Sequence, residues 1–71
     1  MKKLVKSPLP GKILEILVKE GQKISQGQSL FILESMKMHN DIVSEYDGTI
    51  KSILTNTNQI VSSNENIMEL E

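Results

Sequence analysis

The sequence predicts an all-β protein made of two similar halves, and its length, its short apolar runs and an internal repeat lead to this prediction. The chain has 71 residues, which suits one small domain over residues 1–71. Apolar residues make up 38% of the chain and fall in brief runs of Ile, Leu and Val. Gly, Asn, Gln and Ser interrupt these runs so often that short strands fit between the breaks, whereas helices of ordinary length do not.

The internal repeat aligns Pro10–Glu34 with Asp47–Glu71 without a gap, at an offset of 37 residues. Of the 25 aligned positions, 8 are identical: Gly11/Gly48, Ile13/Ile50, Ile16/Ile53, Leu17/Leu54, Gln22/Gln59, Ser25/Ser62, Leu33/Leu70 and Glu34/Glu71. Where the first half has glycine at two turns, the second has Asn58 and Asn64. Asn is the other residue that best tolerates a left-handed backbone, so the turn geometry is kept. Two β-units related by a pseudo-two-fold axis follow, most economically as two antiparallel sheets packed face to face.

Eight strands are expected along the chain. They are Leu4–Ser7, Lys12–Val18, Gln22–Ile24, Ser29–Glu34, His39–Ser44, Thr49–Thr55, Gln59–Val61 and Asn66–Leu70. The second strand is apolar on both faces, which is typical of a strand that is covered on both sides or bent by a bulge. Because Ile16 and Ile53 occupy equivalent places in the two repeats, we expect both in the core.

Composition argues against several classes of function. Cysteine is absent and His39 is the only histidine, so we expect no disulfide, no metal site and no catalytic thiol. The 8 lysines and 9 acidic residues are mixed along the chain, and only 3% of the residues are aromatic, which disfavours a nucleic-acid-binding small β-barrel. No apolar run approaches the roughly 20 residues of a membrane span, and Met1–Lys6 lacks the apolar stretch of a signal peptide. We therefore expect no membrane insertion and a cytoplasmic location.

An unusual bend joins the two repeats. Tight hairpins usually carry Gly or Asn at the bend, because the central residues need positive φ. Here the bend is Met36-Lys37-Met38. The three side chains cannot all be buried at a hairpin tip, and a local rule broken at such a place points to function. The alternative is an ordinary solvated lysine between two methionines that fill gaps in the core.

The run Glu34–Met38 resembles the biotin-attachment motif of biotin carboxyl carrier domains, in which the central lysine is biotinylated. The segment Ser7–Gly11 resembles the one that opens the family's second strand. Glu20–Ile24 with Gly27 resembles its short third strand and the following turn, and Asp47–Ile50 resembles the glycine turn after the attachment hairpin. Together these motifs extend over nearly the whole chain in the family's order and spacing.

The resemblance implies a flattened barrel of two four-stranded antiparallel sheets, the barrel-sandwich hybrid, with Lys37 on a tight turn opposite the chain termini. Bacterial acetyl-CoA carboxylase carriers often have a thumb-like insertion between the second and third strands. The gap-free repeat has no such insertion. The chain therefore looks more like the thumbless carriers of pyruvate carboxylase, transcarboxylase and the sodium-pumping decarboxylases, or like small biotin/lipoyl attachment proteins.

The resemblance also implies a carrier and not an enzyme. Biotin would be attached covalently to Lys37 by biotin protein ligase and would carry a carboxyl group between active sites. The partners would be the biotin carboxylase and carboxyltransferase subunits or domains of a biotin-dependent carboxylase, transcarboxylase or decarboxylase. The isolated domain is expected to be a monomer.

The neighbours of the lysine have implied roles too. Met36 and Met38 match the pair that favours biotin over lipoate, and the ligase would recognise them. Glu34 stands at the acidic position of the motif, but its repetition as Glu71 leaves a purely structural role equally open. His39 occupies a position that varies in the family, so we expect a surface histidine.

Two other functions remain open from the sequence. A lipoyl carrier would differ only in having lipoate on Lys37. An unmodified barrel could serve as an interaction module, as in the hairpin domains of membrane-fusion adaptors. The particular carboxylase and the acyl acceptor also remain open.

Overall fold

Eight short strands form the fold in the computed structural model, which describes residues 3–71. They are β1 (Lys3–Lys6), β2 (Gly11–Ile16), β3 (Lys23–Ile24), β4 (Ser29–Ser35), β5 (Met38–Val43), β6 (Gly48–Ile53), β7 (Ile60–Val61) and β8 (Asn66–Leu70). Each strand overlaps one of the expected strands. The first two residues of the expected domain lie outside the described residues. The prediction of an all-β fold with two four-stranded antiparallel sheets is confirmed.

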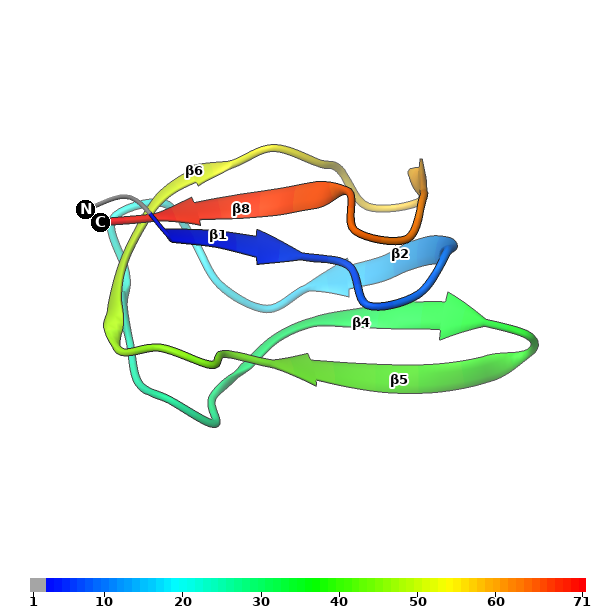
Figure 1. Ribbon diagram of the computed structural model, residues 1–71, viewed down its shortest axis with the longest axis horizontal. Coiled ribbons are helices and arrows are strands. Elements are labelled where there is room, and N and C mark those ends of the chain that lie inside the picture. The colour runs from blue at the N-terminus through cyan, green and yellow to red at the C-terminus, as the bar shows by residue number, and fades with distance from the viewer. Residues whose placement is uncertain (1–2) are drawn as a thin grey trace.

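The two repeats are interleaved. One sheet has the strand order β1-β8-β6-β3 and the other β5-β4-β2-β7. The six longer strands are labelled in Figure 1. The first half of the chain, which contains the first repeat, contributes β1 to β4, and the second half contributes β5 to β8. Each sheet therefore has two central strands from one half and two edge strands from the other. Neither half can complete a sheet without the other.

The backbone keeps the pseudo-two-fold symmetry at the turns. Gly21 and its equivalent Asn58 have φ of 88° and 72°, and Gly27 and Asn64 have φ of 89° and 67°. Each of these turns is closed by a Gln or Glu side chain that accepts a hydrogen bond from the backbone N–H three residues earlier, at 2.8 to 3.1 Å. The predicted exchange of glycine for asparagine at left-handed positions is confirmed.

Bulges occur at equivalent places in both sheets. The register shifts between Ile13 and Glu15 where β2 pairs with β4, and between Ile50 and Ser52 where β6 pairs with β8. The bulge alternative is thus confirmed, but the strand boundary was wrong, because β2 ends at Ile16 and not at Val18. After Ile16 the chain leaves β2 and crosses to the other sheet, where β3 pairs with β6. The end of β6 is shortened in the same way.

The core lies between the two sheets and is apolar. Its buried side chains are Val5, Ile13, Val18, Ile24, Leu30, Phe31, Leu33, Ile50, Val61, Ile67, Met68 and Leu70. Ile16 and Ile53 are only partly buried against this core, so the prediction that both lie within it was wrong in degree. Each is the last residue of its strand, just after a bulge, where the chain turns out of the sheet.

The start of β1 at Lys3 and the C-terminal Glu71 lie at the opposite end of the molecule from the β4–β5 hairpin (Figure 1). The fold measures 33 × 18 × 17 Å, and the long axis separates these two ends. The expected position of the Met36–Lys37 turn opposite the termini is confirmed. Within residues 3–71 there is no helix long and apolar enough to cross a membrane.

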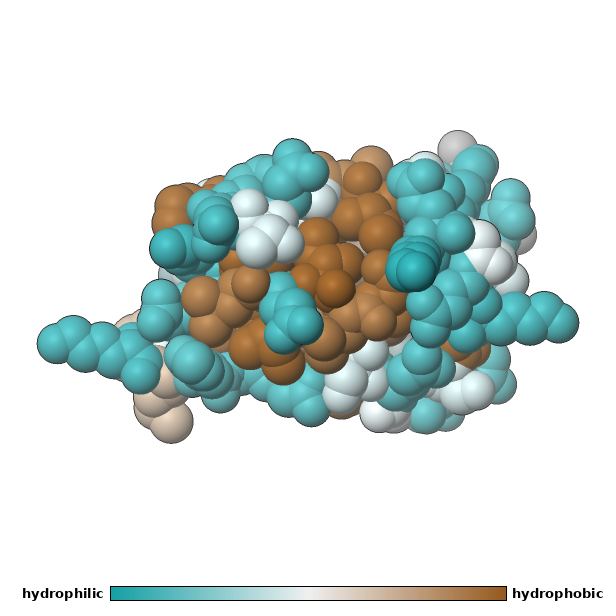
Figure 2. Space-filling model, turned by 180° about the vertical axis from the view of Figure 1, so that it is seen from behind, coloured by the Kyte–Doolittle hydropathy of each residue, from teal (hydrophilic) through white to brown (hydrophobic). Residues whose placement is uncertain are grey.

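Apolar and polar groups are unevenly distributed on the surface. On the face opposite to that of Figure 1, strongly apolar groups gather in the middle and polar groups predominate toward both ends of the long axis (Figure 2). At the hairpin end, moderately hydrophobic groups lie beside the outermost polar side chain.

Thr55 offers a test of the repeat symmetry. It is 3% exposed, and its hydroxyl has no hydrogen-bond partner among the described residues. The equivalent position in the first repeat is Val18. Because a buried unpaired hydroxyl is costly, Thr55→Val should raise the free energy of unfolding by about 1 to 3 kcal/mol. Urea titration measures this change. Val18→Thr should lower stability, and a less stable Thr55→Val protein would contradict the explanation.

Candidate functional site: the β4–β5 hairpin

The hairpin between β4 and β5 closes through a two-residue turn. Ser35 pairs with Met38 across the ladder, which leaves Met36 and Lys37 as the turn. Their φ angles are 53° and 65°. Positive φ at both central residues is the mark of a type I′ turn, whose twist matches that of the flanking strands. Met38 is therefore the first residue of β5, and the expectation that it belongs to the bend was wrong.

This turn has unfavourable residues for its geometry. A residue with a Cβ costs roughly 1 to 2 kcal/mol in the left-handed region, and Asn or Gly avoids most of that cost. The other four left-handed positions among residues 3–71 all have Gly or Asn. Met36 and Lys37 are the exceptions, so the strain is confined to the position where the sequence suggests function.

The base of the hairpin is held by contacts with β2. The Ser35 hydroxyl, which is buried, donates a hydrogen bond of 2.8 Å to the carbonyl oxygen of Pro10. Next to it, a Cβ on Gly11 would collide with the carbonyl oxygen of Glu34, so the close approach of β2 and β4 requires glycine. These two contacts fix the strand that leads into the turn.

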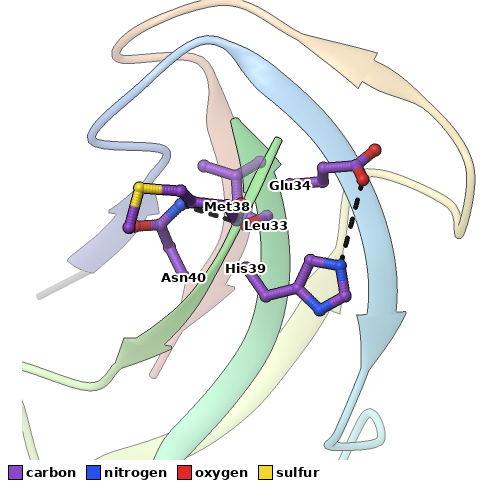
Figure 3. A network of polar contacts seen from close by, with 5 residues as sticks. All are labelled: Leu33, Glu34, Met38, His39 and Asn40. Atoms are coloured by element: carbon purple, nitrogen blue, oxygen red, sulfur yellow. Dashed lines mark hydrogen bonds and ion pairs between the residues drawn. The ribbon is translucent and has the colours of Figure 1, made fainter. Parts of the chain in front are cut away.

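Asn40 supports the strand that leaves the turn. Its side-chain amide donates hydrogen bonds of 3.3 Å to the carbonyl oxygens of Leu33 and Met38. The amide thus bridges both strands of the hairpin beneath the turn (Figure 3). Ser35, Asn40 and the contact of Gly11 with the hairpin were not predicted from the sequence. Gly11 stood out through its repetition as Gly48 and as the end of the Ser7–Gly11 motif. The roles of Ser35 and Asn40 depend on contacts that strand patterns do not reveal.

The three side chains at the tip point into water. Met36 is 93% exposed and Met38 is 66% exposed, and Lys37 is also exposed. The Lys37 side chain makes no hydrogen bond or ion pair with any residue of the described range 3–71. The alternative that the methionines fill core gaps is therefore wrong, and the lysine amine is free for a partner.

Glu34 and His39 lie on the other side of the hairpin from Met38 and Asn40 (Figure 3). Glu34 pairs with His39 in the ladder, and its carboxylate lies 3.9 Å from the imidazole Nε2. The side chains are 41% and 68% exposed, so this contact contributes little to stability. Neither side chain bonds to Lys37, and the expected surface position of His39 is confirmed.

The chemistry available at this end is that of one accessible primary amine. Lysine supplies a nucleophile on a flexible four-carbon stem, which an activated acyl group can convert to an amide. Among residues 3–71, no three His, Cys, Asp or Glu side chains are grouped so that they could hold a metal ion. The hairpin can present a lysine for covalent modification.

The fold and the hairpin define a small all-β protein that presents one lysine at its end. Residues 3–70 match the family described as biotin-requiring enzyme, and the chain belongs to this biotin/lipoyl attachment family. A biotin carboxyl carrier protein of Streptococcus mutans is 41% identical to this chain over 64 aligned residues. These residues are 90% of this chain and 49% of that protein. The methylmalonyl-CoA decarboxylase subunit gamma of Veillonella parvula is 48% identical over 46 aligned residues, which are 65% of this chain and 36% of the subunit. The chain thus spans half or less of these relatives.

Solved structures share the fold. A single-chain, multi-domain long-chain acyl-CoA carboxylase superposes with a TM-score of 0.90 at 22% identity, over 96% of this chain and 7% of the carboxylase. The urea carboxylase of Kluyveromyces lactis superposes with a TM-score of 0.92 at 18% identity, over 100% of this chain and 6% of the enzyme. The architecture is therefore found as a small part of much larger carboxylase chains.

The strain at the turn gives a second prediction. The double substitution Met36→Asn/Lys37→Gly places the residues that a type I′ turn prefers. We expect it to raise the free energy of unfolding by about 1 to 2 kcal/mol, as measured by urea titration. Met38→Asn is the matched control, because Met38 lies in β5 outside the left-handed positions. Equal gains from both proteins would show that the turn is not strained.

Proposed function

We propose that this chain is a biotin carrier domain in which Lys37 is covalently biotinylated. The observation that carries the proposal is an exposed lysine on a strained two-residue turn, with no hydrogen-bond or ion-pair partner among residues 3–71. Membership in the biotin-requiring family supports biotin as the acyl group. The carrier protein and decarboxylase subunit among the relatives support a role in a biotin-dependent carboxylase or decarboxylase.

The residues at the tip fit an attached biotin. The amine of Lys37 is accessible, and converting it to an amide breaks no contact with a described residue. The modification removes a positive charge from an exposed site, so it has little effect on the fold. When attached, biotin supplies carboxyl-group transfer, and the protein supplies position and recognition.

The hairpin would act as a rigid platform for a flexible arm. Contacts of Ser35 and Asn40 hold its two strands, whereas the Lys37 side chain has no fixed partner among residues 3–71. The base that accepts the proton from the amine must come from the ligase, because no described side chain bonds to Lys37. Once the arm is attached, tethering gives the transferred group a high effective concentration at a second active site.

Met36 and Met38 are proposed as the surface that biotin protein ligase reads. Met36 gains no burial from its position and adopts an unfavourable φ, so the folded domain alone does not account for its presence. Two exposed thioethers beside the lysine offer a partner an adaptable apolar contact. Glu34 is assigned only a minor role, since its backbone contacts Gly11 and its carboxylate lies near His39.

A third prediction tests the attachment site. Lys37→Arg should abolish biotinylation by a purified biotin ligase and leave the melting temperature unchanged, since arginine has the same backbone cost at this turn. Intact mass measures the addition of one biotinyl group. Lys51→Arg, in β6, is the matched control and should be labelled like the parent chain. Biotin on the Lys37→Arg protein would refute the assignment, and lipoyl transfer without biotin transfer would favour a lipoyl carrier.

A fourth prediction is that the ligase requires the folded hairpin. Ile13 and Ile50 are buried at equivalent places, and each change to alanine should cost about 2 to 5 kcal/mol. A chain of this size has a stability of roughly 4 to 11 kcal/mol. The double alanine variant should therefore be largely unfolded by circular dichroism and poorly biotinylated, although its tip sequence is intact.

Ile60→Ala is the control for this experiment, because Ile60 is 72% exposed and its truncation leaves the core unchanged. This protein should fold and accept biotin at the parent rate. A synthetic peptide covering Glu34–Asn40 should be labelled poorly. Efficient labelling of the peptide or of the unfolded variant would show that the ligase reads local sequence only.

A further inference from the structure

The three methionines in the described range 3–71 have opposite environments. Met36 and Met38 are 93% and 66% exposed, whereas Met68 in β8 is fully buried. Methionine usually fills irregular gaps in a core, as Met68 does. The exposed pair places two thioether sulfurs in water, on either side of the lysine that the proposed function uses.

The exposed thioethers can react with hydroperoxides, and the buried one is protected. In this reaction an S–O bond forms and the O–O bond of hydrogen peroxide breaks. Sulfur loses two electrons and the peroxide is reduced. The second oxygen leaves as water, with the proton released from the transferred oxygen. The product is methionine sulfoxide, which methionine sulfoxide reductases convert back to the thioether.

We propose that Met36 and Met38 form a reversible oxidation site that controls whether a biotin ligase accepts Lys37. This inference rests on the proposed function and adds a form of regulation to it. A sulfoxide replaces an adaptable apolar group with a polar, chiral one. When the ligase docks on the methionine surface, the sulfoxide oxygen loses its hydrogen bonds to water. The ligase surface offers no hydrogen-bond donor in their place, so the affinity for the domain falls.

The fold should tolerate this oxidation. Neither sulfur takes part in the hydrogen bonds of Ser35 and Asn40 that hold the hairpin, and neither methionine belongs to the core. Oxidation would therefore change the surface beside Lys37 and leave the scaffold intact. Oxidation of Met68 would instead place a polar group in the core, and it requires prior opening of the fold.

The test uses the full chain, shown by intact mass to carry no biotin, treated with hydrogen peroxide and compared with an untreated sample. Peptide mass spectrometry should find Met36 and Met38 oxidised at least about tenfold faster than Met68. Circular dichroism and melting should be unchanged. The kcat/KM of a purified biotin ligase for the oxidised chain should fall roughly tenfold, which corresponds to about 1.4 kcal/mol. Methionine sulfoxide reductases should restore the rate.

A variant that cannot be oxidised at the tip isolates the effect. Met36→Leu/Met38→Leu should have the same labelling rate before and after peroxide, whatever that rate is. Oxidation of Met68 as fast as of the tip pair, an unchanged rate for the oxidised parent, or loss of labelling in the treated leucine variant would each overturn the oxidation inference alone. Failure of the untreated parent to accept biotin would overturn the proposed function and the oxidation inference together.

Discussion

The structure depends on the exchange of edge strands between the two halves of the chain. β1 and β3 from the first half flank the central strands β8 and β6 of the second, and β5 and β7 from the second half flank β4 and β2 of the first. The apolar residues of each half are thereby buried against the other half, which lets so short a chain enclose a core without a disulfide. The left-handed turns and the bulges are repeated in both halves because the two halves pack against each other in equivalent ways.

The turn between β4 and β5 is where the two halves of the chain are joined. Lys3 and Glu71 lie at the symmetry-related place, because β1 pairs with β8 as β5 pairs with β4. The turn residues Met36 and Lys37 therefore connect the two halves and belong to no strand. A turn with two unfavourable residues can persist there because the strands below it are held by Ser35, Gly11 and Asn40.

The repeat made most of the fold predictable, because the alignment of the halves places strands and turns together. Asn58 and Asn64 indicate left-handed turns from the sequence alone, since few other residues tolerate that backbone. Strand ends were less predictable, as at Ile16, because the crossing of the chain to the other sheet depends on tertiary pairing. In the candidate site, the bend itself was apparent from Met36 and Lys37.

The support beneath the bend was less predictable. Ser35 bonds to a residue 25 positions away, and no local pattern marks such a contact. The close approach at Gly11 likewise becomes clear only when β2 and β4 lie side by side. Strand patterns thus located the tip of the hairpin, whereas the contacts that hold its strands could be identified only from the assembled sheets.

The separation of the hairpin from the chain termini has a mechanical consequence. Lys3 and Glu71 lie at the pole opposite Lys37, so a covalent connection made at either of them is separated from the lysine by the 33 Å length of the barrel. A flexible connection at that pole would let the domain rotate as a rigid body, and the flexible Lys37 side chain would extend the range of positions at its far end. The sweep of the lysine is then set mainly by the length of a stiff body, which spans distance without the large entropy loss of an equally long flexible chain.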